Sequence, residues 1–269
     1  MSFVYNFNLV QDIPHFERLP DQIQENIEML IANVVYESFI IPGDQDYLTA
    51  RLLAQKGLFR AFYWAAAQSI EKYLKAFLLF NGGYAVDKHR YRGHPIRRLF
   101  DDAANINKAI INISMEPHPD INIKQDHHYL LQSISLEKFI DDIEAHGSPD
   151  NRYNSSGIEY STHHLFALDN IAYAIRRQIG VPSIECSFKG VHADLIATFE
   201  NDNPLFCYSN NNSWSEISSV IFPIIRSSSF FVTTLDYLIK NKNDTSHIKA
   251  LGWLDKKMKL PQRYINVLK

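Results

Sequence analysis

Cysteine is scarce in this sequence, with only Cys186 and Cys207 among 269 residues. Two cysteines cannot form a disulfide framework, and a chain of this length can bury a core that needs neither disulfides nor metal. The first 20 residues also lack the basic opening and the uninterrupted apolar stretch of a secretion signal. We therefore expect a reducing, cytoplasmic location.

Long apolar runs and an excess of one charge are missing too. The strongest apolar run, residues 220–225, falls far short of the roughly 20 residues that cross a bilayer, and it contains Pro223. With 27 Lys and Arg against 30 Asp and Glu, the formal net charge is -3. No global positive field draws such a protein to nucleic acid or anionic lipid, so any such contact has to be local. We expect no membrane insertion.

Helical periodicity is the dominant pattern in the sequence. Apolar side chains recur at offsets of three and four, and no sustained alternation of apolar and polar residues predicts a sheet. Pro42, Gly43 and Asp44 predict a turn between the first two helices, and Gly57 predicts a second break. The predicted fold class is therefore all-α. The predicted helices are 19–36, 47–55, 58–80, 95–106, 129–145, 162–180, 213–239 with a break at Pro223, and 247–257.

The predicted central helix 58–80 carries a polar stripe on one face. Glu71 and Lys75 lie four residues apart, with Lys72 beside them. One interpretation is a solvated pair, in which replacing Glu71 changes stability by no more than about 0.5 kcal/mol. The other is a buried glutamate, paired with Lys75 or with a basic residue near His94, whose removal costs about 3 to 5 kcal/mol. We expect burial, because the stripe is short and its helix is central.

Three short segments follow one another in the order typical of a known helical family. They are DYLTAR at 46–51, AAQSIEKYLKAFL at 66–78 and GHPIRRL at 93–99. Together they resemble the HEPN domain family, although Ile96 stands where the family has leucine. Arg152 and Tyr153 resemble a short arginine-tyrosine element of many members. The resemblance covers about residues 45 to 180.

The resemblance implies a HEPN-like helical bundle with additions at both ends. The bundle would cover residues 45–182, with an N-terminal helical extension over 1–44 and a C-terminal helical region over 183–269. Members are often dimeric and occur in bacterial defence systems, in toxin-antitoxin pairs and as nucleotide-binding partners of small nucleotidyltransferases. The resemblance therefore implies RNA or a nucleotide as the ligand, a homodimer, and a nucleotidyltransferase or an antitoxin as the partner protein.

Many family members are metal-independent ribonucleases with an arginine followed, after four to six residues, by a histidine. The histidine performs acid-base chemistry on the RNA 2'-hydroxyl, and the arginine stabilises the phosphorane-like charge. No histidine of this sequence follows an arginine at that distance, since Arg90 is one residue too close to His94. Lys88 supplies a charge without the bidentate guanidinium fork. We therefore expect binding, and keep a ribonuclease with His94 as its acid-base residue as an alternative.

The basic segment 88–98 is the predicted contact with phosphate groups. It holds five Lys or Arg and two His in eleven residues, with Tyr91 placed to stack on one base. The alternative is a solvated loop on a non-catalytic helical scaffold. The predicted site consists of His94 as the catalytic candidate and of Glu71, Lys72, Lys75, Lys88, Arg90, Arg92 and Arg152 as binding residues.

Other histidines invite a metal-site interpretation without supporting it. His118, His127, His128 and the adjacent His163 and His164 have no accompanying cysteine and no His-x-x-x-His spacing on one helical face. We therefore expect structural or exposed histidines, no metal ion and no other cofactor.

Overall fold

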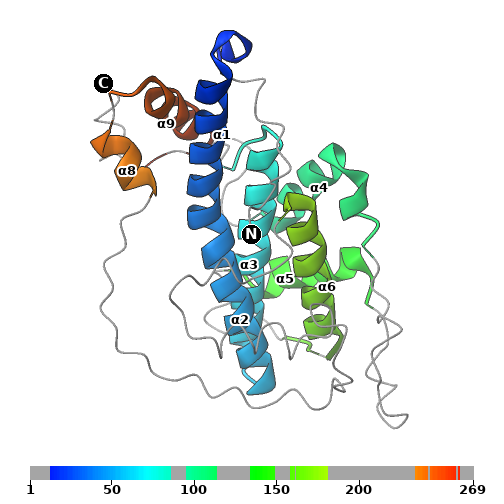
Figure 1. Ribbon diagram of the computed structural model, residues 1–269. Coiled ribbons are helices and arrows are strands. Elements are labelled where there is room, and N and C mark those ends of the chain that lie inside the picture. Colours follow the sequence, from blue (N-terminus) through cyan, green and yellow to red (C-terminus); the bar gives the residue numbers. More distant parts are fainter. Residues whose placement is uncertain are drawn as a thin grey trace, which may run out of the picture.

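Most helices of the computed structural model pack around one long central helix, α3 (Figure 1). The structure describes residues 13–85, 95–113, 134–148, 158–160, 162–180, 234–241, 243–258 and 260. These residues are largely helical and include no strand, so the all-α prediction is confirmed. The helices are α1 (Asp21–Val35), α2 (Ile41–Gln55), α3 (Phe59–Phe80), α4 (Ile96–Ile106), α5 (Leu136–His146), α6 (Thr162–Ile179), α8 (Thr234–Lys240) and α9 (Thr245–Met258).

α1 and α2 run on from one another where the sequence predicts a turn. A π-helical segment, Tyr36–Ile40, joins them, and the amide of Ile41 donates to the carbonyl of Tyr36, five residues earlier. Pro42 comes just after the π-helical segment, so the residue that has no N–H to donate coincides with this local departure from α-helical hydrogen bonding. The turn predicted around Pro42 is therefore wrong, and the predicted helix 47–55 begins earlier, at Ile41.

Gly43 allows close packing of α2 against α3 and does not form a turn. A Cβ atom at this position would lie 2.9 Å from Cε1 of Tyr73 and 3.4 Å from Cβ of Lys72. The missing side chain therefore lets α2 approach α3 closely. The two helices form a hairpin, and the chain turns at the predicted break, Gly57, whose φ of 71° lies in the left-handed region that favours glycine.

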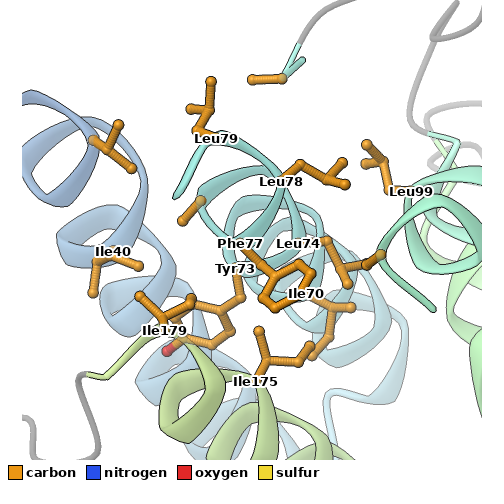
Figure 2. Close-up of a cluster of buried hydrophobic side chains, with 14 of the residues drawn as sticks. Ile40, Ile70, Tyr73, Leu74, Phe77, Leu78, Leu79, Leu99, Ile175 and Ile179 are labelled. Carbon is orange, nitrogen blue, oxygen red and sulfur yellow. The ribbon is translucent and has the colours of Figure 1, made fainter. Parts of the chain in front are cut away.

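α3 supplies the centre of the hydrophobic core, as the apolar stripe of the sequence predicts. Figure 2 shows Leu74 and Phe77 of α3 close to Leu99 of α4 and Ile175 of α6. The apolar periodicity of the sequence predicts a single core of nine residues; eight of them are buried in this cluster, and the ninth, Leu131, lies outside the described residues. The confirmed members are Phe62, Ile70, Leu74, Leu78, Leu99, Phe139, Leu168 and Ile175.

α4, α5 and α6 pack against α3, to the right of α1 in Figure 1. α5 starts later than predicted, because Ser135 is extended and its hydroxyl caps the helix by accepting from the amide of Lys138 at 3.2 Å. The predicted start at residue 129 lies outside the described residues. α6 begins at Thr162 and is followed by Gly180, as predicted.

The last described helices return to α1. α9 packs along α1, and α8 contacts both of them, to the left of α1 in Figure 1. Glu37 holds the start of α8, because its carboxylate accepts from the amide and the hydroxyl of Thr234, each at 2.7 Å. α9 confirms the predicted helix 247–257. None of the helices in the described ranges has the length and apolar character needed to cross a bilayer.

Candidate functional site

The polar stripe of α3 contains a largely buried ion pair. Nζ of Lys75 donates to Oε1 of Glu71 at 2.5 Å, and only 18% and 8% of the two side chains are exposed. The predicted burial of Glu71 is therefore confirmed, with Lys75 as a partner. The further prediction, a partner for Glu71 from residues 88–98, concerns a segment of which the structure describes only residues 95–98.

Lys72 also has a carboxylate partner. Its ammonium group donates to Asp46 of α2, and Oε1 of Gln68 lies 3.4 Å away. Both lysines predicted to bind phosphate thus neutralise an acidic side chain of the bundle. A phosphate group would have to compete with a carboxylate to reach Lys72 or Lys75.

The remaining predicted site residues all lie outside the described residues: Lys88, Arg90, Arg92, His94 and Arg152. The structure does describe both flanks of residues 86–94: α3 ends at Phe80, and on the second flank α4 begins at Ile96 and carries Arg97 and Arg98 of the basic segment. At the second flank, the amide of Arg97 donates to Oε2 of Glu144 at 2.6 Å. The segment therefore connects two helices that the core holds together.

A buried polar network between α2, α3 and α6 was missed by the sequence prediction. Asp44 of α2 and Arg176 of α6 form an ion pair with no exposed side-chain surface. The hydroxyl of Tyr73, on α3, donates to Oδ1 of Asp44 at 2.5 Å. Removing charges from water is costly, so each member depends on the others.

A second ion pair between α2 and α6 completes the network. In this pair α2 supplies the cation and α6 the anion, the reverse of the first pair. NH1 of Arg51, on α2, donates to Oδ2 of Asp169 at 2.8 Å and to the hydroxyl of Tyr47 at 3.2 Å. The Tyr47 hydroxyl donates in turn to Asp169 of α6. Asp44 and Arg51 are seven residues apart on α2, and so are their partners, Asp169 and Arg176, on α6. Opposite charges therefore meet only when the two helices run antiparallel in this register.

Burial controls the protonation of the network. It raises the pKa of Tyr47 and of Tyr73 well above the usual 10, and the adjacent Asp169 and Asp44 add to the rise. Burial also raises the pKa of Asp169, while Arg51 and the Tyr47 hydroxyl act in the opposite direction. The tyrosines are therefore hydrogen-bond donors over the whole neutral range.

One signal in the sequence points to this network. Asp169 and Arg176 interrupt the apolar stripe of α6, and Asp44, Tyr47 and Arg51 lie at offsets of three and seven, on one face of α2. Polar residues on the face that a helix buries need partners. The described members are bonded to one another, so we assign the network to helix alignment.

A second cluster surrounds His164, near the start of α6. Nε2 of His164 lies 3.2 Å from Oδ2 of Asp142, and the ring of Tyr160 stacks on the imidazole at a centroid distance of 5.8 Å. Nζ of Lys138 donates to the other oxygen of Asp142 at 2.5 Å. His164 is buried, which agrees with the structural role predicted for it. No group of three or more metal-ligating side chains occurs within the part of the chain that the structure describes.

A pocket of about 550 Å³ lies between α1, α8 and α9. Its lining includes Met29, Tyr237, Lys240, Asp244 and His247. None of the predicted site residues is among the described residues that line it.

No family model, no curated protein and no solved structure matches the chain. The functional argument therefore starts from the contacts described above and from the resemblance of the three sequence segments.

Proposed function

We propose that this chain is a HEPN-like cytoplasmic protein that binds RNA or a nucleotide in a bacterial defence or toxin-antitoxin system. One observation carries the proposal: the first two segments that resemble the family lie on α2 and α3, the described part of the third, residues 95–99, leads into α4, and α3 packs against both of the other helices. The segments are therefore parts of one packed unit.

The pattern of charges supports a local phosphate contact in the basic segment. Lys72 and Lys75 are paired with Asp46 and Glu71, so their charges are compensated inside the bundle. Residues 88–98 add five Lys or Arg in a chain whose net charge is -3. Arg97 lies 3.8 Å from Asp101 and 3.6 Å from Asp141, so the proposal relies on Lys88, Arg90 and Arg92 of this segment. The phosphate contacts therefore fall to this segment, with Arg152 as a further candidate. A homodimer, and a nucleotidyltransferase or antitoxin partner, belong to the same proposal.

RNA affinity is the direct test. We expect the protein to bind a fluorescent single-stranded RNA of about 12 nucleotides, measured by anisotropy. The variant Lys88→Gln/Arg90→Gln/Arg92→Gln should bind much more weakly, and the slope of log affinity against log salt should fall by about 2, since three phosphate contacts are lost.

A matched variant controls for net charge. Lys56→Gln/Lys240→Gln/Lys256→Gln removes the same number of charges from exposed positions: after α2, at the end of α8 and on α9, respectively. It should retain the wild-type affinity. Equal losses in the two variants, or no binding of RNA or of free nucleotides by the wild-type protein, would contradict the proposal.

A cleavage assay separates binding from catalysis. The same RNA is incubated with wild-type protein and with His94→Ala in the presence of a metal chelator, and the products are resolved by length. We expect intact RNA in both reactions, because the arginine that usually accompanies the histidine is missing. Cleavage by the wild-type protein that is lost in His94→Ala would replace the binding function with the ribonuclease alternative.

A further inference from the structure

The pocket of about 550 Å³ between α1, α8 and α9 has apolar side chains from two helices in its lining. Met29 comes from α1 and Tyr237 from α8, and both are about half exposed, at 54% and 50%. An aromatic ligand makes favourable contacts with a thioether and with another aromatic ring, and it would remove apolar surface from water. The volume lies in the range of small-molecule sites.

Two opposite charges line the same pocket without neutralising each other. Lys240 and Asp244 are exposed, and neither makes a salt bridge within the part of the chain that the structure describes. Oδ1 of Asp244 accepts from the amides of Ser246 and His247, at 2.7 and 3.4 Å. These hydrogen bonds lower the pKa of Asp244 below its usual value, so the group is a carboxylate at neutral pH. A ligand with an ammonium group and a carboxylate would complement both charges.

His247 contributes a buried hydrogen-bond acceptor to the lining. Only 9% of the residue is exposed, and Nδ1 lies 2.8 Å from the carbonyl oxygen of Asn241. A carbonyl oxygen only accepts, so Nδ1 carries the proton, and Nε2 of the neutral ring is an acceptor. Among the described residues nothing donates to Nε2. Buried polar atoms need partners, so an N–H or O–H donor of a ligand would complete this site.

The three features follow one another from the surface inwards: exposed charges, half-exposed apolar side chains and a buried acceptor. An α-amino acid with a polar aromatic side chain has the same order of groups, namely a zwitterion, a flat ring and a donor on that ring. We propose that the pocket binds a free aromatic amino acid of this kind, such as tryptophan or tyrosine. Asp244 and Lys240 hold its charges, Tyr237 contacts its ring, and Nε2 of His247 accepts from its ring donor.

Titration calorimetry with the full-length protein tests the ligand class. We expect saturable binding of L-tryptophan or L-tyrosine. Tryptamine lacks the carboxylate and indolepropionate lacks the ammonium group, so each should bind about tenfold more weakly than tryptophan. Phenylalanine lacks the ring donor and should bind about fivefold more weakly than tyrosine.

Variants of the pocket assign each ligand group to its partner. Lys240→Gln should weaken tryptophan about tenfold and leave tryptamine unchanged, because tryptamine has no carboxylate to lose. Asp244→Asn should weaken tryptophan and leave indolepropionate unchanged, and asparagine still caps α9. His247→Phe should weaken tyrosine but not phenylalanine. Lys240 and Asp244 are exposed, so these two variants keep the test valid even if His247→Phe does not fold. Lys56→Gln, an exposed lysine outside the lining, is the matched control and should bind like the wild-type protein.

Three results would overturn the inference. They are no saturable binding of either amino acid, equal losses for tryptophan and tryptamine in Lys240→Gln, and tighter binding of a nucleoside monophosphate than of either amino acid at this pocket.

The inference and the proposed function fail separately, because the pocket contains no residue of the basic segment. Lys88→Gln/Arg90→Gln/Arg92→Gln should lose RNA affinity and keep the affinity for tryptophan, whereas Asp244→Asn should show the reverse. A protein that binds the amino acid but neither RNA nor nucleotides would contradict the proposed function alone. RNA binding without amino acid binding would contradict the pocket assignment alone.

Discussion

Asp44 of α2 and Arg176 of α6, 132 residues apart in the chain, form an ion pair without exposed side-chain surface. Arg51 and Asp169 form a second buried pair with the charges exchanged. A shift of one helix past the other by a turn would leave buried charges without their partners, at a cost of several kcal/mol each. The two pairs therefore select one alignment of α2 and α6 as well as holding them together.

Asp44→Asn should destabilise the protein strongly. The amide keeps the shape of the side chain but leaves the buried guanidinium of Arg176 without its counter-charge, which costs about 3 to 5 kcal/mol. The change is measured as the shift in the midpoint of urea unfolding. Asp46→Asn is the matched control: its pair with Lys72 is partly exposed, so the loss should stay below about 1 kcal/mol. Equal midpoint shifts in the two variants would mean that burial of the first pair contributes nothing.

Stability should fall at alkaline pH because of the buried tyrosines. The pKa values of Tyr47, Tyr63, Tyr73 and Tyr160 are raised in the folded protein, mainly by burial. Below pH 10 both states hold these protons, so the full stability is present. Above about pH 10 the unfolded chain releases them and the folded protein does not, so each tyrosine lowers the free energy of unfolding by up to about 1.4 kcal/mol per pH unit.

Tyr73→Phe removes one of these titrating hydroxyl groups, so a comparison with the wild-type protein measures its contribution. At neutral pH the variant should be less stable by about 1.5 to 3 kcal/mol, because the hydrogen bond to the Asp44 carboxylate is lost. As the pH rises from about 9 to 11, the wild-type protein should lose stability faster than the variant, and the difference should shrink. Urea unfolding across this range measures both curves. A constant difference would show that Tyr73 titrates alike in the folded and unfolded states.

Gly43→Ala and Gly252→Ala should act in opposite directions, although both glycines are helical. At Gly43 the new methyl group would press on the ring of Tyr73, at 2.9 Å, and the overpacking should cost about 1 to 3 kcal/mol. At Gly252 nothing lies within 4 Å, so the higher helix propensity of alanine should add up to about 1 kcal/mol. Thermal unfolding of the two variants measures both effects, and a stabilised Gly43→Ala would contradict the close contact of α2 with α3.

The helices that the sequence predicts correctly are those with local signals. α3 has a continuous apolar stripe and ends near paired glycines, and α6 starts at Thr162 and stops before Gly180. The prediction of a turn at residues 42–44 is wrong because proline and glycine occur in turns but also, for other reasons, within helices. Pro42 follows the π-helical segment inside a continuous helical run, and Gly43 makes room for Tyr73, which is 30 residues later in the chain. Periodicity along one segment contains no information about that contact.

In the candidate site, too, a feature with a local signal could be predicted, whereas contacts between residues far apart in the chain could not. The burial of Glu71 could be predicted, because it lies in the middle of a central helix. The network of Asp44, Tyr73 and Arg176 could not be paired from the sequence, since its members come from three helices and a polar residue on a helix does not indicate its partner. For the same reason, the hydrogen bond from Nζ of Lys257 to the carbonyl oxygen of Gly82, across 175 residues, has no counterpart in any local pattern.

Glu71→Ala should distinguish a buried pair from a solvated one. The structure places the carboxylate 2.5 Å from Nζ of Lys75 in a largely buried position, so its removal strands a cation with little access to water. We expect a loss of about 2 to 3 kcal/mol, below the larger figure for a fully buried pair, because 18% of the Lys75 side chain stays exposed and can be hydrated. Urea unfolding measures the loss.

A double variant identifies the cause of that loss. If the stranded charge of Lys75 is responsible, Glu71→Ala/Lys75→Met should be more stable than Glu71→Ala alone, since the methionine fills the same space without a charge. The coupling between the two positions should then be about 1 to 2 kcal/mol in a double-mutant cycle. Independent effects that simply add would show that Glu71 stabilises the protein through other contacts. A loss below about 0.5 kcal/mol in Glu71→Ala would instead support the interpretation of Glu71 and Lys75 as a solvated pair, which is the usual state of such a pair on a helix surface.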